Sequence, residues 1–388
     1  MPLNFQQVYE RIREIGQGAQ ARRETLNALR EHALHLLDAW ADKGEALRDK
    51  VERARQADPF LRCAIPLAER LDASLDPGPA AQSPVTLLAA DGSQITPDRH
   101  AAILFGLINV GAIVFPGGAE AAPLVFTDSS LSYAEEVANW TDGLVALRRD
   151  LAERRMLLDL SKDHPAPVIT LTDGPLQLWE SHESDAVFGY EKALAEYLDV
   201  LAQLQKRGVT TAGYVDKPSS NLLVRLLDVA ATPENELKDI HDKQHLPGVT
   251  DRWLFEQVLR PQTRSAVFAL QARSRAVYKD SLALHFFYLN VGRVHHPVVV
   301  RVEVPRWVVE DAEKLDRLCA VLLGQCAVMG AKPYPYILHR AHEVAVVKLE
   351  EKQQIAQMLE LELRRAGGEV DEISGKQSAK DRPGRGKR

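Results

Sequence analysis

Two aspartates in this sequence each follow an apolar run and precede a glycine. Asp91-Gly92-Ser93 comes after Val85–Ala90, and Asp173-Gly174-Pro175 comes after Val168–Thr172. An Asp at the end of a buried strand, followed by Gly, lets the backbone turn close to a ligand. Convergent carboxylates bind hard divalent cations such as Mg²⁺ or Mn²⁺, which can activate water and stabilise the leaving oxygen of a phosphodiester. Each dipeptide can also be an ordinary turn, since Asp-Gly is a common turn sequence.

A metal centre of this kind needs a third carboxylate. The helical stretch between the two aspartates offers Glu135, Glu136 and Glu153. We choose Glu153, which lies in RRDLAERR, because the arginines of that stretch can also meet phosphates. The first two of them, Arg148 and Arg149, are our candidates for contacts to a nucleic-acid backbone. The alternative is that Glu153 is a solvated partner of an arginine one helical turn away.

The sequence KPYPYILHRAHEVAVV near the C-terminus supplies a tyrosine and a histidine of possible chemical use. A neutral His is a good ligand for Mn²⁺, and a Tyr hydroxyl can orient a water or hold a phosphate oxygen. Tyr334 and His342 are the candidates, although His339 would serve nearly as well as a ligand. No Gly-x-x-x-x-Gly-Lys-[Ser/Thr] loop is present, so we expect no ATP hydrolysis by this chain itself.

Composition limits the class of protein. The chain has 388 residues, 45% hydrophobic and 26% charged, with a formal net charge of −6. This charge gives no global reason to expect nucleic acid as a partner, so any such role rests on local features. The three cysteines, Cys63, Cys319 and Cys326, lack metal-site spacing and are expected to be buried thiols. We expect no transmembrane span, no signal peptide and a cytoplasmic location.

The elements that would position the candidate residues follow a recognisable order. Three strand-like runs form an expected antiparallel meander: Val85–Ala90, Ala101–Phe115 and Pro123–Tyr133. Helices and strands then alternate over Ala134–Ser161, Val168–Thr172, Asp185–Lys206, Thr210–Val215 and a helix that begins near Ser219. This β-β-β-α-β-α-β-α order predicts an α/β fold with a mixed sheet of the ribonuclease H-like type. Its first and fourth strands, which carry Asp91 and Asp173, would be neighbours.

The flanking regions are largely helical. Residues Phe5 to about Gln56 form a predicted helical arm, broken near Gly16 and Gly18, with one apolar stripe: Leu26, Leu29, Ala33, Leu36, Trp40, Leu47 and Val51. The stripe packs either on the chain's own body or against a partner helix, such as that of a second copy. Thr250–Pro305 is predicted to be β-rich, and Val308–Met329 and Ile337–Arg365 to be helical. The basic stretch from Ala366 onward is predicted to be disordered.

Several landmarks in order resemble the NurA family of DNA-repair nucleases, from about Val85 to Glu360. They are Asp91-Gly92-Ser93-Gln94, Leu107 to Gly111, Asp173-Gly174, Tyr214 to Pro218 with Lys217, Arg264 to Phe268, Tyr334-Pro335-Tyr336 and Ala341-His342. The resemblance implies Asp91, Glu153, Asp173 and His342 as manganese ligands, with Tyr334 beside them. It also implies a homodimer, and a HerA-type hexameric ATPase as the translocase partner. Lys217 joins Arg148 and Arg149 as a candidate DNA contact.

These inferences combine into one hypothesis. The chain would be a manganese-dependent nuclease, with Mg²⁺ as the other possible ion. It would act as a 5′ to 3′ exonuclease and single-strand endonuclease on single- and double-stranded DNA, in end resection for double-strand break repair. We divide it into a helical arm (1–71), a linker (72–84), a NurA-like nuclease domain (85–365) and a basic tail (366–388). A non-catalytic DNA-binding or translocase-docking adaptor, or a phosphatase acting on small substrates, are the alternatives.

Overall fold

The computed structural model describes residues 3–78, 84–117, 122–178 and 187–367. Contacts group the chain into two units, of which unit 1 comprises Met1–Ala80 and Tyr214–Ala327 and unit 2 comprises Ala81–Gly213 and Val328–Arg388. Most of the basic tail and residues 79–83 of the expected linker lie outside the described residues. The division into arm, linker, domain and tail therefore stays a prediction.

Unit 2 contains a mixed sheet with the strand order β6-β5-β2-β3-β4. Its strands are β2 (Thr86–Ile95), β3 (Phe105–Phe115), β4 (Leu124–Tyr133), β5 (Val168–Asp173) and β6 (Thr210–Val215). β2, β3 and β4 form an antiparallel meander, and β5 pairs with β2 in parallel. The order along the chain and across the sheet is that of the ribonuclease H-like fold, so the predicted fold class is confirmed.

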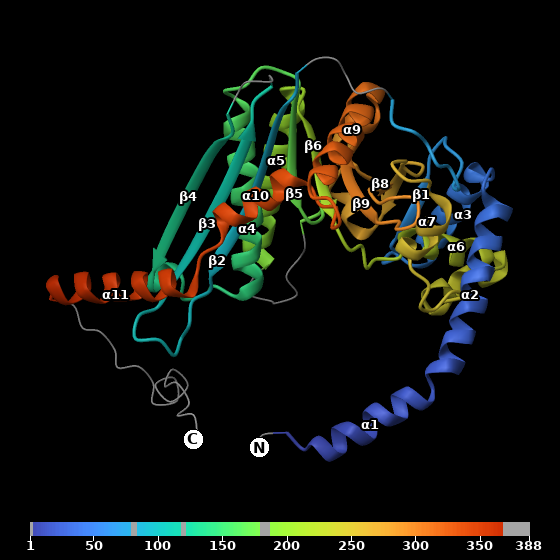
Figure 1. The fold of residues 1–388 in the computed structure, drawn as a ribbon, viewed down its shortest axis with the longest axis horizontal. Coiled ribbons are helices and arrows are strands. Elements are labelled where there is room, and N and C mark those ends of the chain that lie inside the picture. The colour runs from blue at the N-terminus through green and yellow to red at the C-terminus, as the bar shows by residue number, and fades with distance from the viewer. Residues whose placement is uncertain (1–2, 79–83, 118–121, 179–186, 368–388) are drawn as a thin grey trace. The chain divides into compact units, whose positions relative to one another are not determined.

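Helices cover both faces of this sheet. α4 (Asp142–Ser161) and α10 (Tyr336–Ala345) pack on β2 and β3, and α5 (Val187–Lys206) packs against α4. α11 (Leu349–Arg365) lies at one end of the strands (Figure 1). Successive residues of a strand point to opposite faces. At Gly92 the sheet meets side chains of α4, whereas the Ser93 hydroxyl donates to the Ala345 carbonyl of α10, 2.6 Å away. α4 and α10 therefore pack on opposite faces of β2.

The helix expected over Ala134–Ser161 is shorter than predicted. Only a 3₁₀ turn occupies Ala134–Glu136, and α4 begins at Asp142. The side chain of Thr141 accepts a hydrogen bond from the Leu144 N–H, which satisfies one of the free donors of the first helical turn. This N-cap defines the start of the helix and separates it from the preceding turn.

α11 closes a small hydrophobic cluster at the far end of β2 and β3. Ile95, Ile103, Phe105 and Leu107 are buried there, and α11 packs on them with Ile355, Ala356, Leu359 and Leu363. Ile355 and Ala356 lie four and three residues before Leu359, and Leu363 lies four after it, so these residues share one face of α11.

Unit 1 contains four antiparallel strands and most of the remaining helices. The strands run in the order β1 (Cys63–Pro66), β7 (Phe268–Gln271), β8 (Leu284–Asn290) and β9 (Val299–Pro305). The helices are α1 (Phe5–Gln17), α2 (Ala19–Trp40), α3 (Gly44–Ala57), α6 (Leu222–Ala231), α7 (Asp251–Val258), α8 (Arg306–Val309) and α9 (Ala312–Val328), with 3₁₀ turns at Glu234–Asp242, Arg273–Ala276 and Asp280–Leu282.

The segment from about Thr250 to Pro305 was predicted to be β-rich, but a helix, α7, forms at its beginning. The Thr250 side chain accepts from the Trp253 N–H and caps this helix. The buried carboxylate of Asp251 accepts from the backbone N–H groups of Leu223 and Val224 at the start of α6. Thr250 and Asp251 thus cap α7 and α6 at the beginning of a segment that was expected to be β-rich.

The helical arm packs on the chain's own unit through its second half. α2 contacts α6 and α7 and buries Ala33 and Leu37, and α3 buries Leu47 and Val51. The alternative in which the stripe packs on the chain's own body is therefore confirmed for Ala33, Leu47 and Val51, whereas on α2 the buried leucine is Leu37 and not the predicted Leu36. All three cysteines are buried, as predicted, and burial raises the pKa of Cys63 and Cys319 to about 12 and that of Cys326 to about 11.

Candidate active site

Parallel pairing of β2 and β5 brings the two predicted aspartates to neighbouring strands. Ala90 is the register partner of Thr172, so the residues that follow them, Asp91 and Asp173, lie side by side on adjacent strands. β5 ends at Asp173, as expected, and the following Gly174 has φ +90°, a conformation that favours glycine. Asp91 does not end its strand, however, because β2 continues to Ile95 in register with β3.

His342 lies directly against Asp91. Its Nδ1 atom is 2.6 Å from the Asp91 Oδ2 atom, and the two side chains form an ion pair when the imidazole is protonated. The imidazole is largely exposed, whereas the carboxylate is mostly covered. The predicted combination of Asp91 with His342, rather than His339, therefore exists in the structure, since His339 instead faces Glu343 at 3.6 Å.

A group of hydrogen bonds holds the last turn of α10 over the sheet. The Ala345 carbonyl accepts from the Ser93 hydroxyl at 2.6 Å and from Asn109 Nδ2 at 2.7 Å. The Ser93 hydroxyl also accepts from the Val347 N–H at 3.1 Å, and Ser129 donates to Asn109 Oδ1 at 2.6 Å. Residues from β2, β3 and β4 thus fix the backbone one helical turn beyond His342.

Glycine at two positions allows these close approaches. A Cβ on Gly111, the partner of Asp91 on β3, would lie 2.5 Å from the Ala345 nitrogen. A Cβ on Gly92 would lie 2.7 Å from Glu153 Oε1 and 2.4 Å from Arg149 Cγ. Distances this short exclude a side chain, so α10 and α4 approach the strands at these points because both residues are glycine.

Glu153 is a buried carboxylate of α4 and is only 7% exposed. Arg149 lies one turn earlier on the helix, with its Nε 3.5 Å from Glu153 Oε1 and its Nη2 2.9 Å from Asp150 Oδ1. Burial raises the pKa of Glu153 well above its usual value, and the negative charges of Asp150 and Asp91 raise it further. Glu153 is therefore buried rather than solvated, although Arg149, one helical turn away, is its ion-pair partner.

Asp173 lines a cavity of about 250 Å³ next to Glu153. Arg149, Asp150 and Arg154 of α4 line the same cavity, and the segment from Thr172 to Leu178 forms its opposite wall. The structure thus gathers Asp91 with His342 on one side of Gly92, and Glu153 with Asp173 around the cavity on the other.

The other predicted residues, Tyr334, Arg148 and Lys217, are not among those that line the cavity beside Glu153. Tyr334 is half-buried just before α10, and from Tyr336 to His342 that helix rises about 9 Å. Arg148 is exposed and its guanidinium lies 4.5 Å from the centre of the Trp140 ring, away from Arg149. Lys217 is exposed and belongs to unit 1, whereas the carboxylates belong to unit 2.

The donor chemistry of the site fits a hard divalent cation. Carboxylate oxygens and an imidazole are its usual ligands. The pKa of Glu153 is raised first by burial and then by the negative charges of Asp150 and Asp91, and a cation bound here would offset those charges. The described residues contain no group of three or more His, Cys, Asp or Glu side chains already arranged around one point. Glu153 of α4 approaches β2 at Gly92, whereas Asp91, the preceding residue of β2, contacts His342 of α10.

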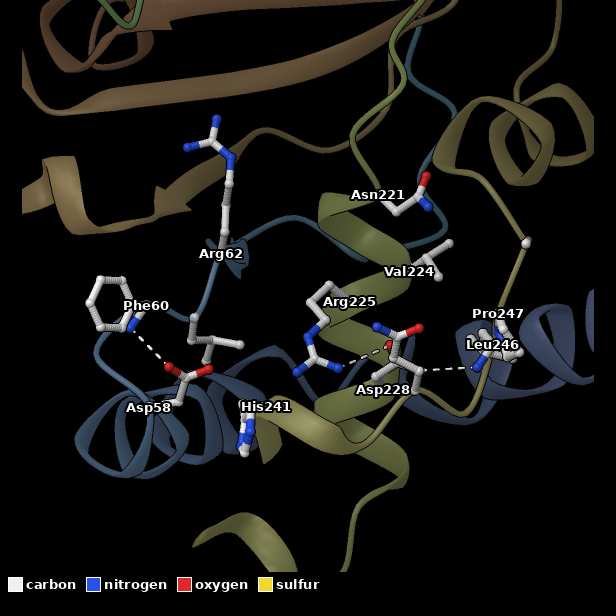
Figure 2. A pocket seen from close by; sticks show the side chains of 13 residues that line it. Asp58, Phe60, Arg62, Asn221, Val224, Arg225, Asp228, His241, Leu246 and Pro247 are labelled. Carbon is white, nitrogen blue, oxygen red and sulfur yellow. Dashed lines mark hydrogen bonds and ion pairs between the residues drawn. The ribbon is translucent and has the colours of Figure 1, made fainter. Parts of the chain in front are cut away.

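A second hollow, of about 380 Å³, lies in unit 1 and has a different character. Figure 2 shows Arg225 directed toward Asp228, 3.3 Å away, with Phe60 and His241 around the same space. Arg225 also donates to the backbone carbonyls of Ile240 and Lys243. None of the residues predicted to act in chemistry lines this hollow, so the candidate site remains that of unit 2.

Comparison with known proteins settles the family. The NurA domain matches residues 85–347. This chain belongs to the NurA family. The solved NurA nuclease from Sulfolobus solfataricus is similar at 12% identity with a TM-score of 0.47, covering 85% of this chain and 97% of that one. The catalytic domain of human endonuclease V is similar at 14% identity with a TM-score of 0.32, covering 82% and 98%. None of the curated proteins matches.

Within the NurA domain, sequence reasoning missed the residues that position the site. Ser93, Asn109 and Ser129 hold α10, yet none was singled out as a candidate. A signal for one of them exists, because Asn109 is the polar residue in the apolar run LINVG, where an apolar strand residue would be expected. A buried Asn requires hydrogen-bond partners, and these prove to be the Ala345 carbonyl and Ser129.

Proposed function

We propose that this NurA-family chain is a metal-dependent DNA nuclease, with Asp91, Glu153, Asp173 and His342 as its metal-binding side chains. The observation that carries the proposal is the 2.6 Å contact between His342 and Asp91. The buried carboxylate of Glu153 lies close to the next residue of β2, Gly92. A packing role alone does not account for Glu153, because burying a carboxylate is costly even when an arginine such as Arg149 lies beside it. The sequence match to the NurA domain supports the same assignment.

Each side chain has a role that follows from its position. Asp91 and Asp173 present oxygens from adjacent strands, Glu153 supplies a third carboxylate, and His342 orients the Asp91 carboxylate or binds the cation beside it. A bound Mn²⁺ or Mg²⁺ would activate the attacking water and offset the charge that develops on the phosphate. Tyr334 is proposed to position the phosphate or the water. Arg148, Arg149 and Lys217 are proposed to contact the DNA backbone, which makes binding depend strongly on salt.

The NurA resemblance supports a cellular role that can be tested with defined partners. We propose 5′ to 3′ exonuclease and single-strand endonuclease activity with manganese, a homodimer, and a HerA-type hexameric ATPase as partner in the resection of DNA ends. The chain lacks a phosphate-binding loop for ATP, so the partner would supply the translocation. Through the described part of the chain, no helix has the length and apolar character needed to cross a membrane.

The direct test uses the full chain with linear and single-stranded DNA labelled at the 5′ or the 3′ end. We expect shortening of the strand with Mn²⁺ or Mg²⁺ and none with EDTA, with the label position reporting the polarity. Mononucleotides and a small phosphate ester form a parallel arm. Cleavage of the small substrates without cleavage of DNA would favour a phosphatase. DNA binding without any cleavage, even with the ATPase added, would favour a non-catalytic adaptor.

A further inference from the structure

The cavity beside Glu153 contains a buried arginine, Arg154, whose guanidinium is not hydrogen-bonded. Arg154 is 3% exposed, and its Nη1 atom is buried without a hydrogen-bond partner. Across the residues the structure describes, its guanidinium makes neither a hydrogen bond nor an ion pair. Burying a guanidinium whose Nη1 makes no hydrogen bond is costly even with the Glu153 charge nearby, so a structural role alone does not account for an arginine at this position.

A second unpartnered polar atom belongs to the same cavity. Thr172, the last residue before Asp173, is 1% exposed, and its Oγ1 atom is buried without a hydrogen-bond partner. Arg154 and Thr172 both line the space of about 250 Å³. A guanidinium has five donors and no acceptor, and a hydroxyl adds another donor. The ligand that satisfies this pair is therefore rich in acceptor oxygens.

The wall opposite Arg154 is rigid. The Tyr197 hydroxyl donates to the Leu176 carbonyl at 2.6 Å, and Tyr197 is itself buried. Gly213 of β6 packs so tightly on this segment that a Cβ there would lie 2.5 Å from the Gly174 carbonyl oxygen. The cavity is thus preformed, and it is larger than the roughly 30 Å³ that one water occupies in the liquid.

The other charged side chains of this part of α4 pair with one another or with α5 and form no ion pair with Arg154. Arg149 already lies 2.9 Å from Asp150 and 3.5 Å from Glu153, so these two carboxylates have a cation beside them. Arg155, the next residue, ion-pairs with Glu196 on the outer side of the helix. Arg149 and Arg154 both line the cavity together with the carboxylates of Asp150, Glu153 and Asp173, but only Arg154 of these two arginines is without a hydrogen bond or ion pair among the described residues.

We propose that Arg154 and Thr172 form a phosphate-binding subsite that holds a phosphate of the DNA strand next to the carboxylates. This inference rests on the proposed function, because the location beside Asp173 identifies the phosphate as part of a nuclease substrate. The group bound is either an internal phosphodiester or the terminal 5′-phosphate, and both present acceptor oxygens to a guanidinium.

Binding without cleavage tests the subsite separately from catalysis. The full-length protein is titrated, in EDTA, against two single-stranded oligonucleotides that differ only in a 5′-phosphate or a 5′-hydroxyl. Arg154→Met is compared with Arg155→Met, which removes the same charge from the adjacent, exposed position. We expect Arg154→Met to weaken binding about 10-fold or more, as for loss of a charge-assisted hydrogen bond, and Arg155→Met to weaken it far less.

The two oligonucleotides distinguish the source of the phosphate. An equal loss for both assigns an internal phosphodiester, and a loss confined to the 5′-phosphorylated strand assigns the terminal group. Equal effects of the two arginine variants, or no effect of Arg154→Met, overturn the subsite. If Arg154→Met lowers the melting temperature sharply, Thr172→Val decides the question, because it removes only a hydroxyl. Unchanged DNA affinity of Thr172→Val then overturns the proposal.

Inorganic phosphate provides an arm that needs neither DNA nor catalysis. We expect phosphate to raise the melting temperature of the wild type above that in chloride of equal ionic strength, and Arg154→Met to abolish this rise. A wild type that responds to phosphate but cleaves no DNA refutes the proposed function and leaves the anion site intact. A wild type that cleaves DNA with Arg154→Met binding normally refutes the subsite alone.

Discussion

The imidazole of His342 and the carboxylate of Asp91 meet at 2.6 Å although they are 251 positions apart in the chain. The contact depends on α10 lying across β2 and β3, where Gly111 leaves room for the helix backbone. The helix is in turn held through the Ala345 carbonyl, one turn after His342. The position of this pair is therefore a property of the whole sheet of unit 2 and not of a local motif.

The hydrogen bonds to Ala345 should matter for cleavage more than for folding. Ser93→Ala removes the hydroxyl that donates to Ala345 and accepts from Val347, at a cost of about 1 kcal/mol in unfolding free energy. We expect slower single-turnover cleavage at a temperature where the variant is folded, with DNA affinity unchanged. Ser129→Ala, which reaches α10 only through Asn109, is the control and should have the smaller effect. Equal cleavage rates for Ser93→Ala and wild type would contradict this role.

Gly92→Ala tests the close approach of α4 to β2. The added methyl would lie 2.4 Å from Arg149 Cγ and 2.7 Å from Glu153 Oε1, so both side chains must shift. We expect cleavage to be lost and stability to fall by about 1–3 kcal/mol, as for overpacking elsewhere. Gly324→Ala in α9 is the matched control, because no atom lies within 4 Å of its added methyl. We expect Gly324→Ala to leave cleavage unchanged and to be neutral or slightly stabilising. Normal cleavage by Gly92→Ala would contradict the assignment of Glu153 to the active site.

The raised pKa of Glu153 predicts a specific pH dependence of stability. Between its usual pKa of 4.5 and the higher folded value, the folded state holds a proton that the unfolded chain releases. Stability from this group therefore falls as pH rises through that window, and the penalty is absent below it. Glu153→Gln should melt higher than wild type at pH 8, and the difference should shrink toward pH 4.5.

Thermal unfolding over a pH series measures this effect. The exposed Glu350, in the first turn of α11, provides the control variant Glu350→Gln. We expect the control to show no comparable gain at high pH. A Glu153→Gln gain that is constant across the series would mean that packing, and not ionisation, separates this variant from the wild type.

Regular patterns in the sequence were sufficient to predict the elements of unit 2. The strands and helices from Thr86 to Lys206 follow the predicted order, and parallel pairing places Asp91 beside Asp173. The sequence also identified Glu153 on α4 and His342 on α10. The choice of Glu153 rested on the arginines around it, and the choice of His342 on the resemblance to the NurA family.

Features that depend on tertiary contacts could not be predicted from the sequence. Asp91 lies within β2 and not at its end, because pairing with β3 extends the strand through an apparent Asp-Gly-Ser turn. α7 lies in a segment that was expected to be β-rich, where Thr250 caps it and Asp251 caps α6. The unpartnered atoms of Arg154 and Thr172 became visible only when the fold placed both in one cavity.

The most direct measurement is cleavage of end-labelled single-stranded DNA by Asp91→Asn with Mn²⁺, beside wild type and Asp163→Asn. Asp163 is an exposed aspartate of the same unit, so its variant has the same change in charge away from the site. We predict that Asp91→Asn abolishes cleavage while melting temperature and DNA affinity stay near those of the wild type, and that Asp163→Asn cleaves normally. Undiminished cleavage by a folded Asp91→Asn would contradict the assignment of this carboxylate to the active site.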